Sequence, residues 1–407
     1  MAALRECECL YAEYYCKVLE AADQQYLRGG EALREALSQW ESESENIFAG
    51  HAWAETHSEE NLEAARLCVG YPAAGAYLIG LRLHSRERIR WLEKAVAAAA
   101  HLRDRRAQAA AWGNMGVAFK NLGKLDQAVK CHERALEIAR EIPSKRDEGV
   151  ALSNLGITLA ALGNPRRAIE MHEAAILLFQ EIEDHRSKGA SLGNLGNAYA
   201  DLGDTNRAVQ LQQERLNLAK SLGDRRGEGN AIGNLGLLWA ELGNQEMAQQ
   251  HYEQQLEICR ELGDPRGEGD ALSNWGDLHA EKGDWNEAAG FYERRLRLAR
   301  EFGDLRAEGR VLAKLGVARA KLLSFDLANQ HCEQALKIAR QIGDRRGEAI
   351  SLWGLARVLY GDRETTKAIA AAKAALGIFQ DIGDHRATKV RQQVESWRMP
   401  GRPNDKD

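Results

Sequence analysis

Apolar and polar residues follow one another in this chain with a pattern that repeats every 40 residues. Within residues 224–263, a first apolar row has the three- and four-residue spacing of one helix face, at Ala231, Ile232, Leu235 and Leu238. A glycine suited to ending a helix follows at Gly243. A second row with the same spacing follows at Ala248, Tyr252, Leu256 and Cys259. The short connection forces the two helices to run antiparallel, so each unit is predicted to be an antiparallel helix pair.

Polar residues at fixed positions mark where these predicted helices begin and end. A residue able to cap a first helix recurs at Asp104, Ser144, Asp184, Asp224, Asp264, Asp304, Asp344 and Asp384. A glycine ends the first helix at Gly123, Gly163, Gly203, Gly243 and Gly283. Caps for the second helix are predicted at Asn164, Asp204, Asn244 and Asp284. A period of this length predicts a stack of about 15–20 helices in which each unit buries its apolar face against the next.

The residues of each unit resemble the tetratricopeptide repeat. The first unit carries the pattern most fully, with Trp112, Met115-Gly116, Phe119, Ala128 and Ala135. The usual repeat has about 34 residues, and this chain is similar to the 40-residue subclass found in spindle-orientation adaptors and kinesin light chains. The resemblance covers residues 105–383, seven units. It implies an all-α fold, a right-handed superhelix (α-solenoid) of antiparallel helix pairs.

Two departures from the repeat pattern concern the later units. A small second-helix residue is replaced by Arg215, Gln255 and Arg295, and the Asn-x-Gly signature is lost at 354–356. We expect the last units to be looser or to act as a cap.

The chain ends are predicted to differ from the repeats. Residues 58–104 look like a degenerate helix pair, and residues 1–57 read as an N-terminal helical segment. The stretch from Gly29-Gly30 to Trp53, with Tyr71-Pro72 after it, is similar to the region that joins the ATPase core to the repeats in bacterial STAND-class signalling ATPases. No Gly-x-x-x-x-Gly-Lys-Ser/Thr motif is present, so the ATPase core is missing. We expect a capping helix at 384–397 and a disordered tail at 398–407.

Composition narrows the classes of function. A net charge of −5 lacks the basic excess of a nucleic-acid-binding protein. No apolar run approaches the roughly 20 residues that span a bilayer, and charges interrupt the N-terminus. We therefore expect a cytoplasmic protein with no nucleic-acid or membrane partner, whose seven cysteines stay reduced. No catalytic, metal or cofactor motif stands out, so the chain is predicted to be non-enzymatic and to need no cofactor.

An asparagine recurs in five successive first helices, and we call this row the asparagine ladder. Its members are Asn114, Asn154, Asn194, Asn234 and Asn274. In this repeat family the first helices line a concave groove. An amide side chain can donate to and accept from a peptide backbone, so the ladder predicts a site for an extended protein segment. The alternative is that each asparagine ties its own helix to the next repeat. Both are possible together.

Charged residues near the ladder could set the direction of a bound segment. The middle repeats carry Asn197, Asp201, Asn230, Glu241, Asp270 and Asp277. Lys314 then replaces the sixth ladder asparagine, with Arg310 nearby. The groove is thus predicted to change from an acidic centre to a basic C-terminal end, which would orient a ligand. Ordinary solvated surface charge is the alternative.

A row of arginines with the same 40-residue period, including Arg106, Arg146, Arg186 and Arg226, is better explained by ion pairs between repeats than by phosphate recognition. The sequence as a whole predicts a non-enzymatic platform for a protein or peptide ligand in the concave groove. The alternatives are a sensor arm of a STAND-type ATPase and a self-assembling structural solenoid. The identity of the ligand and the oligomeric state stay open.

Overall fold

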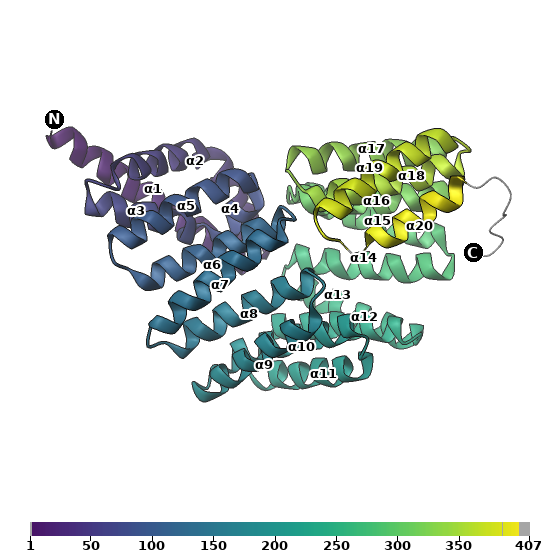
Figure 1. The fold of residues 1–407 in the computed structure, drawn as a ribbon, viewed down its shortest axis with the longest axis horizontal. Helices are drawn as coiled ribbons and strands as arrows, with labels where there is room; N and C mark the ends of the chain where they lie inside the picture. The colour runs from purple at the N-terminus through teal and green to yellow at the C-terminus, as the bar shows by residue number, and fades with distance from the viewer. Residues whose placement is uncertain (1, 385, 399–407) are drawn as a thin grey trace. The chain divides into compact units, whose positions relative to one another are not determined.

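The structure, a computed structural model, describes residues 2–384 and 386–398, and within these ranges it contains 20 α-helices and no strand. Figure 1 shows that most of them are paired side by side along the chain. The first helices of the seven pairs are α6 (Arg105–Asn121), α8 (Lys145–Ala161), α10 (His185–Leu202), α12 (Arg225–Glu241), α14 (Pro265–Lys282), α16 (Leu305–Lys321) and α18 (Arg345–Gly361). The second helices are α7 (Leu125–Glu141), α9 (Pro165–Glu181), α11 (Thr205–Ser221), α13 (Gln245–Glu261), α15 (Trp285–Glu301), α17 (Phe325–Gln341) and α19 (Thr365–Asp381). The predicted all-α repeat solenoid is therefore confirmed, and its helices keep the 40-residue register throughout.

The predicted caps of the first helices are confirmed at all eight positions. Each side chain accepts a hydrogen bond from a backbone N–H in the first turn; Asp224, for example, accepts from Gly227 N at 3.1 Å. Three of the four predicted second-helix caps are confirmed as well, at Asn164, Asp204 and Asn244. The fourth is wrong, because the Asp284 side chain makes no cap hydrogen bond and its carboxylate lies 3.6 Å from His279 Nδ1.

The glycine of the Asn-x-Gly signature makes room for one side chain of the second helix. A Cβ at Gly116 would lie 2.5 Å from the ring of His132, and one at Gly276 would lie 2.6 Å from the ring of Tyr292. The corresponding partners elsewhere are His172, Gln212, Tyr252 and Cys332. In the last repeat, where the signature is lost, Ala356 stands in place of the glycine and the second helix carries the small Ala372. The contact is thus kept by a matched change on both helices.

The N-terminal helices form a bundle that precedes the repeats. They are α1 (Ala2–Arg28), α2 (Gly30–His57), α3 (Leu62–Ala74), α4 (Ala76–Arg82) and α5 (Ser85–His101). The Tyr71 hydroxyl donates to Ala12 O at 2.7 Å, and the buried His51 ring stacks on Trp91 with centroids 3.7 Å apart. In the part of the chain that the structure describes, no single helix is long and apolar enough to cross a membrane, while α3 and α4, bent by 70°, pass this test as a pair.

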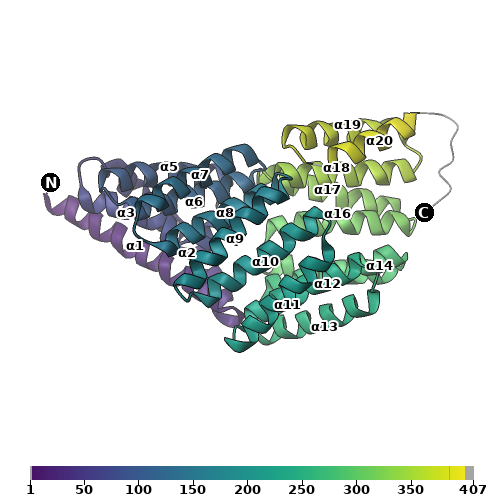
Figure 2. The ribbon, with the colours of Figure 1, turned by 60° about the horizontal axis from the view of Figure 1, so that its bottom comes forward.

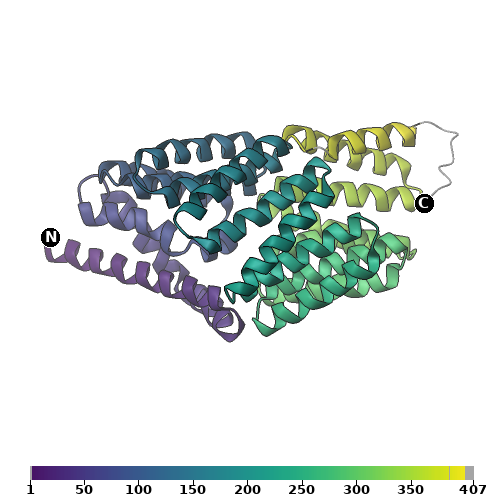
Figure 3. The ribbon, with the colours of Figure 1, turned by 90° about the horizontal axis from the view of Figure 1, so that it is seen from below.

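The chain divides into two compact units, one ending at Glu268 and the other beginning at Gly269. In the first unit the repeats curl back toward the N-terminal bundle, and Figures 2 and 3 show the loop between α1 and α2 beside the later repeats of this unit. Gly30 N donates to Gly263 O at 2.8 Å, and Arg226 Nη2 donates to Leu27 O at 3.3 Å. These bonds connect α1 and α2 to α12 and to the loop after α13.

The second unit ends in α20 (Arg386–Arg398), which covers the last repeat. Val390 and Val394 are buried against α18 and α19, and the Trp397 ring stacks on Trp353 and on Tyr360, with centroids 5.6 and 4.3 Å apart. Arg398, the first residue of the predicted disordered tail, is the last residue of α20, and residues 399–407 lie outside the described residues.

Candidate functional site

The first helices of unit one expose one continuous side, which we call the first-helix surface. On α12 the residues that face the second helix, including Ala231, Leu235 and Leu238, are buried, while Asn230 and Glu241 are exposed. On α10, Asp201 corresponds to Glu241 and is exposed, and so is Asn197 one turn before it. Arg226 lies on the same side of α12 and reaches the end of α1. The first-helix surface therefore faces the interior of the curl.

The asparagine ladder borders this surface. All five ladder asparagines are half-buried, with Asn114, Asn154, Asn194 and Asn234 in the first unit and Asn274 in the second. Among the described residues, none of their side chains makes a hydrogen bond to the protein. Their amide groups can therefore donate to and accept from a further partner.

Two of the polar residues near the ladder contact other side chains of the protein. Asn197 accepts a hydrogen bond from Gln212 Nε2 at 3.0 Å, and the exposed Asp270 lies 3.5 Å from the buried guanidinium of Arg295. Asn230, Asp201 and Glu241 are exposed.

Lys314 and Asp277 act on each other in the second unit. Lys314 Nζ lies 2.6 Å from Asp277 Oδ2 and donates to Ser273 Oγ at 2.9 Å, while Tyr292 donates to the other oxygen of Asp277 at 2.7 Å. These opposite charges largely offset one another, so this pair contributes little to the change of sign predicted along the groove. Arg310 is exposed. Burial lowers the pKa of Arg386, and the charges of Arg346 and Arg310 lower it further.

The arginine row forms the expected ion pairs between repeats. Arg146 Nε lies 3.4 Å and Arg186 Nε 3.7 Å from the aspartate that caps the next first helix, Asp184 and Asp224 respectively. In the second unit, Arg346 Nε lies 3.0 Å from Asp384. These pairs are mostly exposed, so each contributes at most about 1 kcal/mol to stability.

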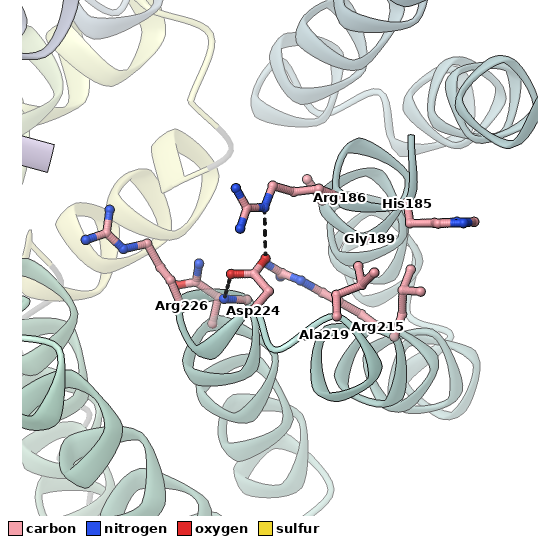
Figure 4. A pocket seen from close by; sticks show the side chains of 12 residues that line it. His185, Arg186, Gly189, Arg215, Ala219, Asp224 and Arg226 are labelled. Atoms are coloured by element: carbon pink, nitrogen blue, oxygen red, sulfur yellow. Dashed lines mark hydrogen bonds and ion pairs between the residues drawn. The ribbon is translucent and has the colours of Figure 1, made fainter. Parts of the chain in front are cut away.

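A pocket of about 410 Å³ opens between α10, α11 and α12 in the first unit. Figure 4 shows Arg186, Arg215 and Arg226 around Asp224. The neutral lining residues include Gly189, Ala190, Leu218 and Asn230. Three guanidinium groups thus surround a single carboxylate, which also caps α12. The pocket carries an excess of positive charge.

Arg215 is the pocket residue without a partner of its own. Its guanidinium packs over Gly193, where an added Cβ would lie 2.3 Å from Nη1. Burial lowers the pKa of Arg215, and the Asp224 carboxylate partly opposes this effect. Within the described part of the chain, Arg215 makes no ion pair or hydrogen bond. The sequence showed Arg215 only as a departure from the repeat pattern, and the pocket was not predicted.

Comparison with known proteins places the chain in a family. The family model described as "Tetratricopeptide repeat" matches residues 107–176, 147–221, 227–301 and 308–381, which is more than half of the chain. The chain therefore belongs to the tetratricopeptide repeat family. A search of curated protein sequences finds no match.

Solved structures show the same fold at low sequence identity. A Rap protein complexed with competence and sporulation factor is 12% identical, with a TM-score of 0.59, over 97% of this chain and 100% of that one. Aspartyl phosphate phosphatase F from Bacillus subtilis is 13% identical, with a TM-score of 0.52, over 94% and 96%. A STAND ATPase with a tetratricopeptide repeat sensor from Pyrococcus horikoshii is 14% identical, with a TM-score of 0.53, over 94% and 63%. The resemblance to a STAND sensor region predicted from the sequence is thus supported by a shared fold.

Proposed function

We propose that the chain is a non-enzymatic binding protein whose first-helix surface holds an extended segment of a peptide or protein. The observation that carries this proposal is the asparagine ladder, whose half-buried amides make no hydrogen bond within the described residues. None of the ladder amide atoms is among the buried polar atoms without a partner, so these amides are accessible from outside and can exchange water for a ligand. An extended backbone offers both donors and acceptors at regular intervals.

The spacing of the ladder suits an extended chain. In the first unit, four ladder asparagines lie on successive first helices that pack against one another. Neighbouring packed helices are about 10 Å apart, so the four amides span about 30 Å. About ten residues of extended chain cover this distance. A segment of this length is the expected ligand.

A solved relative supports the general function. The Rap protein of similar fold is described as complexed with competence and sporulation factor, so this fold is known with a bound partner. A second candidate function is a sensor arm, because the STAND ATPase shares the fold over 94% of this chain. A sensor arm would use the same surface to bind its signal, and the ladder argument applies to both candidates.

The test compares two ladder variants with a matched control. The double change Asn194→Ala and Asn234→Ala removes two ladder amides, while Asn206→Ala removes an exposed amide from the second helix α11. Binding is measured by fluorescence anisotropy with a labelled library of extended peptides about ten residues long. Two lost amides, each worth about 1 kcal/mol or somewhat more, should weaken binding by about 30-fold.

Stability separates binding from a structural role. Because the ladder side chains make no hydrogen bond within the described residues, the double variant should unfold within about 0.5 kcal/mol of the wild type. The control should match the wild type in both respects. If the double variant instead loses stability and binds normally per folded molecule, the asparagines support the repeats and the proposal is wrong.

A further inference from the structure

The repeats offer an internal comparison for the pocket residue Arg215. At the same position in the second helix, 80 residues later, stands Arg295, and between them stands Gln255. Arg295 is only 7% exposed, yet it has a partner, because Asp270 on the adjacent first helix lies 3.5 Å away. The second unit thus shows how this fold accommodates a buried arginine at this position.

The position that supplies the carboxylate has a different residue in each of these repeats. Asp270 corresponds by the 40-residue period to Asn230 and to Ala190. Arg295 is therefore matched with Asp270, Gln255 with Asn230, and Arg215 with Ala190. In the first two pairs the two side chains are complementary in charge or polarity. In the third, Ala190 offers only a methyl group, and the Arg215 guanidinium packs over Gly193, one helical turn beyond the counterpart of the glycine that Arg295 covers, Gly269.

The missing carboxylate leaves an open space. Ala190 and Arg215 both line the 410 Å³ pocket, a volume within the range of small-molecule and side-chain sites. Arg186 and Arg226 line it too. The one carboxylate present, Asp224, accepts from Gly227 N at 3.1 Å and lies 3.7 Å from Arg186 Nε. Arg215 is half-buried, and the one carboxylate near it, Asp224, is shared with Arg186 and caps α12, so an added anion is favourable here.

We propose that this pocket binds a carboxylate carried by the ligand, which pairs with Arg215 as Asp270 pairs with Arg295. The proposal rests on the proposed function in one respect, since the carboxylate belongs to a glutamate, an aspartate or the C-terminus of the bound segment. Arg215 provides a planar group that can hold a carboxylate through two hydrogen bonds. Arg186 and Arg226 add positive charge at the rim.

The position of the pocket agrees with this assignment. Ala190 and Asn230 line it, and each lies one helical turn before a ladder asparagine, Asn194 and Asn234. A segment held by the ladder would thus pass the pocket mouth. Backbone contacts to amides do not read sequence, so the pocket would supply a preference that the ladder lacks.

The experiment uses two peptide libraries that differ in one residue. Both have extended peptides about ten residues long with amidated C-termini, one with a single glutamate at varied positions and the other with glutamine. Wild-type protein should bind the glutamate library at least tenfold more tightly, and the preference should shrink as salt is raised. Arg215→Gln, which installs the residue found at position 255, should abolish the preference, so that the two libraries bind with the same affinity.

A second variant fills the pocket from within. Ala190→Asp installs the carboxylate that Asp270 provides in the later repeat, so it should also abolish the preference. It should raise the melting temperature in the wild-type background and fail to do so in the Arg215→Gln background. This stability readout does not require a peptide, so it tests the pocket even if no library binds.

The outcomes separate the two proposals. If neither library binds, the proposed function fails, and the effect of Ala190→Asp on melting still decides whether the pocket accepts a carboxylate. If both libraries bind equally to the wild type, or the preference survives in either variant, the carboxylate pocket is refuted. A matched phosphoserine library that binds more tightly than the glutamate library, through Arg215, would overturn the assignment of a carboxylate in favour of a phosphoryl group.

Discussion

Buried histidines make the first unit sensitive to acid. His172 is 1% exposed, packs against Gly156, and has no hydrogen-bond partner for Nδ1 in the described residues. Burial lowers its pKa from the ordinary 6.5 to about 4. His132 in the preceding repeat is buried as well, and burial together with the charge of Lys120 lowers its pKa to about 4. Both histidines are neutral in the folded protein at pH 7.

The sign and size of the effect follow from these values. A histidine whose folded pKa is depressed favours the unfolded state once the pH falls below the unfolded pKa of about 6.5, since the unfolded chain then takes up the proton first. Between pH 7 and pH 5, a shift from 6.5 to about 4 at His172 corresponds to a loss of about 2 kcal/mol in the free energy of unfolding. Below the folded pKa the loss levels off. For a unit of this size, 2 kcal/mol corresponds to about 4–8 °C in melting temperature.

The substitution His172→Gln tests this reasoning, because Gln212 occupies the same position in the next repeat. Urea unfolding followed by circular dichroism at pH 7 and at pH 5 gives the pH dependence of each variant. We expect the variant to lose about 2 kcal/mol less than the wild type on going from pH 7 to pH 5. His101→Gln, which changes an exposed histidine at the end of α5, should behave as the wild type. An unchanged pH dependence in His172→Gln would contradict the assignment of a buried neutral histidine.

Two further predictions concern packing in the second unit, and the first of them has its control in the first unit. Gly276→Ala places a Cβ 2.6 Å from the buried ring of Tyr292 and should reduce stability by about 1–3 kcal/mol in urea unfolding. As its control, Gly113→Ala has nothing within 4 Å of the added Cβ and should be neutral or stabilising by up to about 1 kcal/mol. Equal effects of the two changes would contradict the packing account. Trp397→Ala removes the stacking on Trp353 and Tyr360 and should expose the last repeat. Hydrogen exchange should then be faster in α18 and α19. Unchanged exchange there would show that α20 does not stabilise the repeat.

The periodic features of the fold could be predicted from the sequence because each depends on local chemistry. Asp224 can cap α12 whatever surrounds it, and Gly243 adopts a positive φ of 78° because it has no side chain. The prediction of a cap at Asp284 was wrong because it considered only the residues next to Asp284 in the second helix. His279, one turn away in the structure, competes for its carboxylate.

The candidate site was predicted only in part, because its key features depend on contacts between helices. The ladder was visible as a row, but whether Asn194 has a partner could be decided only from its surroundings. The sequence shows Lys314 as a change of charge in the repeat pattern. Its ion pair with Asp277 could not be predicted in the same way, because the two residues lie on different first helices. The signal for the pocket was present, since Ala190, Asn230 and Asp270 vary together with Arg215, Gln255 and Arg295. That comparison requires knowing that the two positions face each other.

The contact of Gly30 with Gly263 could not be predicted, because no pattern relates residues so distant in the sequence. It joins the loop between α1 and α2 to the loop after α13, and Arg226 on α12 reaches the end of α1 beside it. Long-range closure of this kind depends on the sum of small rotations between repeats.

The most direct measurement of the central claim follows the side-chain amide signals of asparagine by NMR during titration with a peptide selected from the library. If the first-helix surface binds an extended segment, the signals of Asn154, Asn194 and Asn234 should shift together and saturate with the same affinity, while that of Asn206 on α11 stays in place. Shifts confined to the N-terminal bundle, with the ladder signals unchanged at saturation, would contradict the claim.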